Sequence, residues 1–217
     1  FIIATPIGNL EDITFRAIRI LQNEVDIIFC EDTRQSKKLL DHYTIKIPMK
    51  SLHAHSSDKQ IQNAVSLLQE GKTIAYMSDS GTPGLSDPGN KLVAAVASYD
   101  IPIIPIPGPS ALTSIISICG FSGKNISFGG FLSKKPGRRI NELHKLKESG
   151  SIIVIYESPH RIKKTLQAIK EVFPEGNICI GRELTKIYEE VLRSSILELD
   201  INSIVEKGEF VLAISNY

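Results

Sequence analysis

The sequence predicts an α/β protein of two domains, with a mostly parallel sheet in the first domain and a mixed sheet in the second. Short β-branched runs alternate with helix-period patterns, which is typical of β-α-β units. The later strands follow one another with little helix between them, which favours a partly antiparallel second sheet. The chain of 217 residues is long enough to bury two such cores.

The first domain is expected over residues 1–110 and should contain five strands. Its third helix should begin after Ser56 or Ser57, because serine is a good N-cap, and it carries Ile61, Ala64 and Val65 at helical spacing. Proline and glycine in "PGPSA" then mark the start of another helix and a domain boundary near residues 108–112. The expected strands are 1–4, 26–30, 52–56, 72–78 and 101–106.

The second domain is expected over residues 111–217. Its helices are predicted at Arg138–Glu148 and at His160–Phe173, and Pro159 is placed to start the second of these. The expected strands are 127–132, 151–156, 177–181, 189–199 and 208–215.

Composition points to a soluble intracellular protein. Apolar residues make up 42% of the chain and charged residues 23%, and no apolar run approaches the roughly 18 residues that span a bilayer. Cys30, Cys119 and Cys179 are isolated, which favours a reduced, cytoplasmic location without disulfides. Residues 1–111 carry 10 Lys/Arg against 12 Asp/Glu, and the remainder 15 against 12. The basic second half favours an anionic partner.

Unusual loops follow four strands of the first domain: "TPIGN", "EDTR", "SDSGTPGLSDPG" and "PGPSA". Ligands of open α/β sheets lie beyond the carboxyl ends of the strands, and small residues let the backbone approach a ligand closely. The loops therefore predict one ligand-binding rim, although the long loop alone could be a surface connection and "TPIGN" a simple turn. Neither G-x-x-x-x-G-K-[ST] nor G-x-G-x-x-G is present, which argues against a kinase-like or ordinary NAD site.

The charged motifs of the first domain leave two interpretations open. "CEDTR" places Glu31, Asp32 and Arg34 at a strand end, either as part of a site or as a helix cap with a local ion pair. His53 and His55 are expected on one strand face. A zinc site would need a third ligand that the sequence does not indicate, so we expect no metal site.

The second domain also carries charged clusters beside Gly and Pro or at strand ends. Each could be a solvated surface or an ordinary ion pair, or it could contact phosphate groups and a substrate. "YESPHR" is notable because Tyr156, Glu157 and Ser158 end a buried strand. The basic candidates are Lys134, Lys135, Arg138, Arg139 and Arg161, and the next strand ends with Arg182, Glu183 and Lys186.

Taken together, the motifs resemble those of the ribosomal RNA small subunit methyltransferase I family. The resemblance rests on "ATPIGNLEDIT", "CEDTR", "SDSGTPGLSDPG", "PGPSA", "GFL", "YESPHR", "REL" with "TK" and "EE", and "KGEFVL", in that order over nearly the whole chain. It implies the tetrapyrrole methylase type of fold and 2′-O-methylation of a cytidine in 16S ribosomal RNA. The chain departs from the family at Ser80, where Ala is usual, and ends at Tyr217, where many members continue into a small helical extension.

The resemblance also implies S-adenosylmethionine as methyl donor, bound in a cleft between the two domains. It implies 16S ribosomal RNA or the small ribosomal subunit as partner, and a homodimer without membrane association. The donor-binding residues carried over from the family are Pro6, Gly8, Asp79, Gly81, Thr82, Pro83, Leu85, Ser110, Ala111 and Tyr156.

Methyl transfer to a ribose hydroxyl requires alignment of three atoms and removal of one proton. The candidates for the base are Glu31, Asp32, Glu157, and Glu183 with Lys186, whose pKa a cationic donor could lower. Arg34, Arg161 and Arg182 would hold phosphates or the ribose, and no metal is required. The alternatives are a methyltransferase of the same fold acting on a tetrapyrrole or other small molecule, and a non-catalytic RNA-binding protein.

Overall fold

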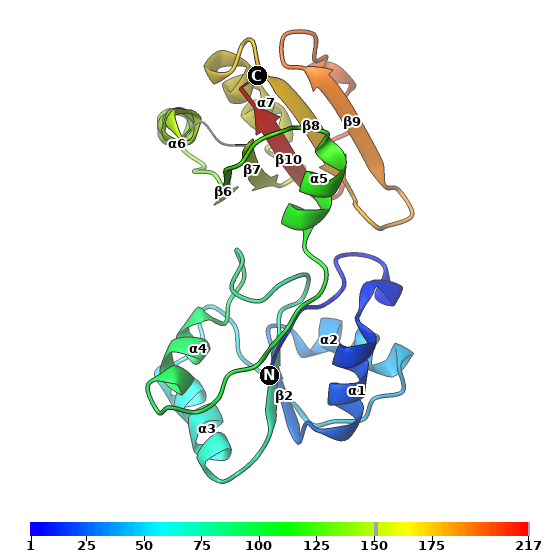
Figure 1. Ribbon diagram of the computed structural model, residues 1–217, viewed down its shortest axis with the longest axis vertical. Helices are drawn as coiled ribbons and strands as arrows, with labels where there is room; N and C mark the ends of the chain where they lie inside the picture. Colours follow the sequence, from blue (N-terminus) through cyan, green and yellow to red (C-terminus); the bar gives the residue numbers. More distant parts are fainter. Residues whose placement is uncertain (150–151, 217) are drawn as a thin grey trace. The chain divides into compact units, whose positions relative to one another are not determined.

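The computed structural model describes residues 1–149 and 152–216, which form two compact units, Phe1–Ser110 and Ala111–Tyr217 (Figure 1). Each unit contains a five-stranded sheet with helices packed on it. The first sheet is parallel and the second is mixed, which confirms the predicted α/β class. The strand expected to begin at residue 151 is described from Ile152, because residues 150–151 lie outside the described range.

The strands of the first unit lie in the order β3-β2-β4-β1-β5, and every neighbouring pair is parallel. All their carboxyl ends therefore lie at one edge of the sheet. The strands are β1 (Ile2–Ile3), β2 (Ile27–Cys30), β3 (Met49–Ser51), β4 (Ile74–Met77) and β5 (Pro105–Ile106).

Both faces of this sheet are covered, with α1 and α2 on one side of β2 and α3 and α4 on the other (Figure 1). Alternate residues of a strand face opposite sides, so Ile28 packs in the core that includes α1 and α2, and Phe29 in the core that includes α3 and α4. The helical segments are η1 (Leu10–Asp12), α1 (Phe15–Asn23), α2 (Thr33–His42), α3 (Asp58–Gln69) and α4 (Asn90–Ala97).

The start of α3 confirms the predicted serine cap. Ser57 precedes the helix and forms a capping box with Gln60, whose Oε1 accepts the Ser57 amide at 2.9 Å. The strand expected at 52–56 is wrong, because β3 ends at Ser51. His53 and His55 instead lie in the following turn, where the His55 amide donates to His53 Nδ1 at 3.2 Å. They share a polar contact, but not a strand face.

The strands of the second unit lie in the order β6-β7-β10-β8-β9. β6 runs parallel to β7, and the three other neighbouring pairs are antiparallel. β8 and β9 form a hairpin, and β10 returns between β7 and β8, which produces the predicted mixed sheet. The strands are β6 (Ile126–Phe131), β7 (Ile152–Glu157), β8 (Asn177–Arg182), β9 (Glu190–Ser195) and β10 (Phe210–Ser215).

The helical segments of this unit are α5 (Ala111–Cys119), α6 (Pro136–Glu148), α7 (Ile162–Val172) and η2 (Ile201–Ser203). α6, α7 and one sheet face enclose a core that includes Leu143 and Leu166. α5 packs against β8 and β10, where a Cβ on Gly181 would lie 3.1 Å from Ile115 Cδ1. Helix α7 begins at Ile162, later than predicted, because the Ser158 carbonyl accepts the Arg161 and Ile162 amides in a turn.

No helix in the described part of the chain is both long and apolar enough to cross a membrane. The three cysteines are buried and form no disulfide, as the sequence predicts.

Candidate functional site

Two of the unusual loops join at the carboxyl edge of the first sheet. Thr5, after β1, forms an antiparallel bridge with Gly81 in the long loop after β4. The Thr5 amide donates to the Gly81 carbonyl at 2.9 Å, and the Gly81 amide donates back at 3.0 Å. The buried Thr5 hydroxyl adds a bond to the Ser78 carbonyl at 3.1 Å. The long loop is therefore fixed to the end of a central strand.

The loop between β5 and α5 is the third member of this rim. Thr82 Oγ1 donates to the Pro109 carbonyl at 3.3 Å. A Cβ on Gly108 would lie 3.1 Å from Ala4 Cβ, which brings this loop against the residue that follows β1. We call the segments 5–9, 78–89 and 107–110 the donor rim. The rim brings together Gly81, Thr82 and Pro109, as the sequence predicts for loops at one sheet edge.

Glycines fix the path of the long loop. Gly84 and Gly89 have φ of +83° and +129°, which L side chains rarely adopt. A Cβ on Gly84 would lie 2.6 Å from Asn90 Oδ1, and one on Gly89 would lie 2.8 Å from the buried Tyr76 ring. The loop is thus a packed wall rather than a free surface connection.

An acidic pair connects the long loop to the end of β2. The Asp32 amide donates to Asp79 Oδ1 at 2.9 Å, and the Asp79 amide in turn donates to the Glu31 carboxylate. Within residues 1–149 and 152–216, no Lys or Arg forms an ion pair with Glu31 or Asp79. The two carboxylates therefore lie at the rim without a cation of their own.

The surroundings shift the pKa values of Glu31, Asp79 and Asp32 in different directions. Burial, followed by the nearby Asp79 charge, raises the pKa of Glu31. Burial also raises the pKa of Asp79, and the Asp32 amide offsets part of that effect. The Arg34 side chain, and then the Arg34 amide, lower the pKa of Asp32 to about 2.

Asp32 is the N-cap of α2, and its Oδ1 accepts the Arg34 amide at 2.8 Å. Its other oxygen pairs with Arg34 Nη2 at 2.6 Å. The structure therefore supports the cap-and-ion-pair interpretation for Asp32 and Arg34. Of the two carboxylates in "CEDTR", Glu31 is the better proton acceptor.

In the second unit, Tyr156 holds the start of α5. Its hydroxyl accepts the Leu112 amide at 3.1 Å, and its ring packs edge-on against Phe128 and Phe131 at centroid distances of 4.9 and 5.8 Å. Tyr156 therefore positions the helix that follows Ser110.

Glu157, another candidate base, is buried and hydrogen-bonded within its own unit. Its Oε1 accepts the Ser158 amide at 2.7 Å, and its Oε2 accepts the Thr165 hydroxyl at 2.6 Å. Arg161 Nη2 lies 3.2 Å from the same Oε2. With both oxygens occupied, Glu157 stabilises the turn before α7.

Lys186, a further candidate base of this unit, lies in an ion-pair cluster. Lys186 Nζ donates to Glu183 at 2.9 Å and to Glu209 at 2.8 Å. Burial alone would lower the pKa of Lys186, but the two acidic partners raise it overall. For Glu183, burial raises the pKa, while Lys186 and the Glu209 amide lower it overall. This ion-pair cluster keeps Lys186 protonated and Glu183 ionised.

The basic candidates of the second unit fall into different environments. Arg182 Nε donates to Glu190 at 2.8 Å, beside a pocket with an apolar floor that includes Ile180 and Phe210. Arg161 Nη2 donates to the Leu132 carbonyl at 2.6 Å. Lys134, Lys135 and Arg138 are exposed, whereas Arg139, which was predicted with them as an RNA contact, is buried.

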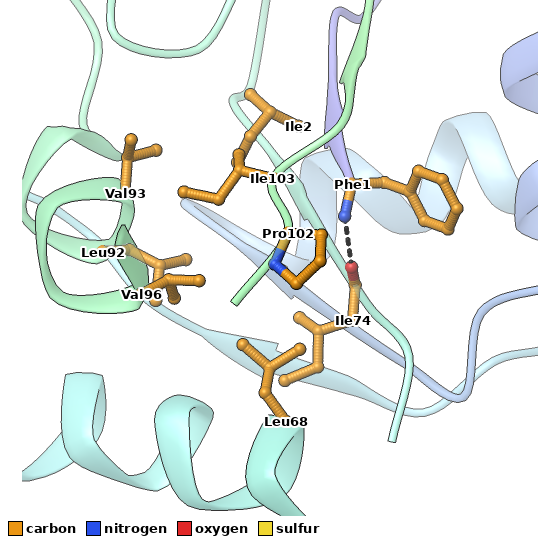
Figure 2. Close-up of a pocket in the computed structure, with 9 residues that line it drawn as sticks. All are labelled: Phe1, Ile2, Leu68, Ile74, Leu92, Val93, Val96, Pro102 and Ile103. Atoms are coloured by element: carbon orange, nitrogen blue, oxygen red, sulfur yellow. Dashed lines mark hydrogen bonds between the residues drawn. The ribbon is translucent and has the colours of Figure 1, made fainter. Parts of the chain in front are cut away.

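A separate apolar pocket lies at the opposite edge of the first sheet (Figure 2). It is lined by residues at strand starts, such as Phe1 and Ile74, whose backbone groups bond at 2.7 Å, and by Leu92 and Val96 of α4. Ligands of parallel sheets bind at the carboxyl edge, so this pocket is not the candidate site. No cluster of three metal-ligating side chains occurs among the described residues.

Several residues of these clusters were not predicted from the sequence. Thr5 and Pro109 could have been found, since both stand inside quoted motifs at strand ends. Glu209 stands in the quoted motif "KGEFVL", but its contact with Lys186 depends on tertiary structure. Thr165 lies in no quoted motif, and helix phase brings it to Glu157.

Residues 1–200 match the sequence model of the tetrapyrrole (corrin/porphyrin) methylases. The chain is 41% identical to the ribosomal RNA small subunit methyltransferase I of Leptospira biflexa, over 100% of this chain and 90% of that protein. The protein of the same name from Thermotoga maritima is 44% identical, over 91% of this chain and 88% of that protein. The chain belongs to the ribosomal RNA small subunit methyltransferase I family. That family shares the tetrapyrrole methylase domain.

Solved structures agree on the fold. A cobalt precorrin-4 methyltransferase aligns with a TM-score of 0.72 at 15% identity, over 97% of this chain and 92% of that one. The uroporphyrin-III C-methyltransferase of Thermus thermophilus, complexed with S-adenosyl homocysteine, aligns with a TM-score of 0.66 at 12% identity, over 98% of this chain and 95% of that one. At such identities, the likeness concerns the fold alone.

Proposed function

We propose that this protein transfers a methyl group from S-adenosylmethionine to the ribose 2′-oxygen of a cytidine in 16S ribosomal RNA. The observation that carries the proposal is the donor rim, where the Thr5–Gly81 bridge joins motif loops in a chain of this family. We extend the proposal to a homodimer acting in the cytoplasm on RNA or on the small ribosomal subunit.

The residues of the rim fit such a donor. S-adenosylmethionine carries a sulfonium and an ammonium group, and the carboxylate of Asp79, which forms no ion pair among the described residues, supplies negative charge. Gly81, with φ of +79°, and its neighbours offer a close backbone surface for a flat polar ligand. The residues proposed to hold the donor are Pro6, Gly8, Asp79, Gly81, Thr82, Pro83, Leu85, Ser110 and Ala111.

When bound, the donor supplies a methyl group on a positively charged sulfur. The fixed rim orients the acceptor hydroxyl for in-line attack, and such alignment is worth about 7–11 kcal/mol in favourable cases. Glu31 then accepts the hydroxyl proton on its carboxylate, since its pKa lies above that of an ordinary glutamate. The Asp79 amide holds this carboxylate in place, and the Asp32 amide in turn holds the Asp79 side chain.

Arg34, Arg182 and the exposed Lys134, Lys135 and Arg138 are proposed to contact RNA phosphates. Such contacts fix register without reading sequence. Arg34 retains donors beyond its bond to Asp32 and is 87% exposed at its side chain.

Calorimetric titration with S-adenosylmethionine, followed by transfer assays with two acceptors, tests the proposal. The acceptors are small ribosomal subunits that lack the ribose methyl group, and uroporphyrinogen as a tetrapyrrole. We expect donor binding and transfer to the subunits alone. Transfer to the tetrapyrrole alone would support the small-molecule alternative, and absence of donor binding would refute the proposal.

A further inference from the structure

Arg139 of α6 is buried without a partner. It is 6% exposed, and its Nε is enclosed without a hydrogen bond. Within residues 1–149 and 152–216, no carboxylate lies within ion-pair distance of its guanidinium. An enclosed N–H donor without an acceptor is costly. The Arg139 Nε is therefore a buried donor that no described residue satisfies.

The N-terminus of α6 provides further donors at the same place. Lys135 is the N-cap and its side chain makes no capping bond, while Pro136 occupies the first helical position. The first bond of the helix runs from the Arg139 amide to the Lys135 carbonyl, so the amides of Gly137 and Arg138 have no helical acceptor. This 13-residue helix thus begins with free N–H groups and the positive end of its dipole.

Helix geometry favours an Arg139 side chain that lies near these amides. Side chains of a helix lean toward its N-terminus, so a residue in the second turn reaches back over the first. Arg161 contacts the segment that precedes α6, since its Nη2 donates to the Leu132 and Ser133 carbonyls at 2.6 and 3.3 Å. Its Nε, like that of Arg139, is buried without a partner.

The surroundings are positive. Lys134, Lys135 and Arg138 are exposed on the same short segment. Two acidic side chains of this unit have other partners, since Glu142 Oε2 accepts the Ser133 amide at 2.8 Å and Glu157 pairs with Arg161. Anion binding here would therefore leave existing bonds intact.

We propose that the N-terminus of α6 and Arg139 form a binding site for one phosphate group, and that this group is a backbone phosphate of the RNA substrate. The amides of Gly137 and Arg138 would each donate to one phosphate oxygen, and the Arg139 guanidinium would donate in its fork geometry. The site itself stands on geometry, and the assignment of the phosphate to RNA rests on the proposed function.

Gly137 gives the sharpest test, because a Cβ added there would meet nothing within 4 Å. Gly137→Glu places a carboxylate at the phosphate position, and an acidic residue in the first turn does not weaken the helix. Gly137→Gln has the same size without the charge. His144→Glu adds the same charge at an exposed position two turns further along α6. Arg139→Met removes the guanidinium, and Arg139→Lys keeps the charge without the fork.

Two quantities are measured on the full chain at several salt concentrations. The first is its stabilisation by inorganic phosphate, and the second is its affinity for an oligonucleotide of the 16S substrate region. We expect Gly137→Glu and Arg139→Met to weaken the affinity for phosphate and the affinity for RNA by about tenfold or more each. Arg139→Lys should weaken these affinities less. The salt slope for RNA should fall by about 0.7 for the lost contact. Gly137→Gln and His144→Glu should stay close to the wild type.

Equal binding by Gly137→Glu and Gly137→Gln would overturn the site. Loss of the phosphate response in Gly137→Glu with unchanged RNA affinity would show a site for a free phosphate group and overturn the RNA assignment. If the variants separate as expected but the wild type transfers no methyl group, the anion site stands and the proposed function fails.

Discussion

At the scale of single residues, environment distinguishes carboxylates that look alike in the sequence. Glu31 and Asp32 are neighbours, yet Asp32 caps α2 and pairs with Arg34, whereas Glu31 faces Asp79 with a raised pKa. The sequence allowed the cap at Asp32 to be predicted, because Asp is a favoured N-cap before a helical pattern. The sequence could not show which of the two is the better base, because the pKa of Glu31 depends on Asp79 in the loop after β4.

Glu31→Gln should reduce methyl transfer by a factor of about 10² to 10⁴ while donor affinity stays within a few-fold of the wild type. Because the pKa of Glu31 is raised, the wild-type rate should fall as the pH drops through that raised value, and the variant should lose this limb. Single-turnover rates from pH 5 to 9 measure both effects. Glu70→Gln, on the surface after α3, is the matched control; an unchanged rate in Glu31→Gln would exclude Glu31 as the base.

Lys186→Met should destabilise the second unit by about 1–3 kcal/mol, because it leaves Glu183 without its cation. The folded-state pKa of Glu183 is lowered, so its stabilising contribution is present above the unfolded-state value near 4.5 and is lost as the pH falls through the folded value. Urea unfolding at pH 7 and pH 3 measures this. If the wild type exceeds Lys186→Met in free energy of unfolding by as much at pH 3 as at pH 7, the stabilising role of the Lys186–Glu183 ion pair is contradicted.

At the scale of elements, the positions of the loops after parallel strands could be predicted from the sequence, but the exact bounds of every element could not. Strand periodicity located the ends of β1, β2 and β4, and thus the shared rim. The position of β3 was missed, because "LHAHS" has the alternation of a strand but forms a turn after Ser51. The burial of Arg139 was also missed, because helix phase separates it from Arg138 within one basic run.

Gly89→Ala should destabilise the first unit by about 1–3 kcal/mol and weaken donor binding, because the added methyl group would meet the Tyr76 ring under the donor rim. Gly71→Ala is the matched control, since Gly71 also has positive φ but open space around its Cβ position. Thermal unfolding and donor titration of both variants make the comparison. Equal losses in the two variants would mean that the long loop is not packed as a wall.

At the scale of the whole molecule, family membership and local geometry support the same account. The relatives from Leptospira biflexa and Thermotoga maritima bear the name of a ribosomal RNA methyltransferase, and the rim where we propose donor binding is fixed by the Thr5–Gly81 bridge and the bond from the Asp32 amide to Asp79. The class of both sheets followed from strand patterns. Contacts such as Lys186 with Glu209 depend on tertiary register and could not follow from them.

The most direct test is to locate the methyl group after transfer from labelled S-adenosylmethionine to small ribosomal subunits that lack it. A 2′-O-methyl group protects the next phosphodiester bond from alkaline hydrolysis. The account predicts that the label is recovered in an alkali-resistant dinucleotide that begins with cytidine. Label recovered on a base, in a mononucleotide released by alkali, would contradict it.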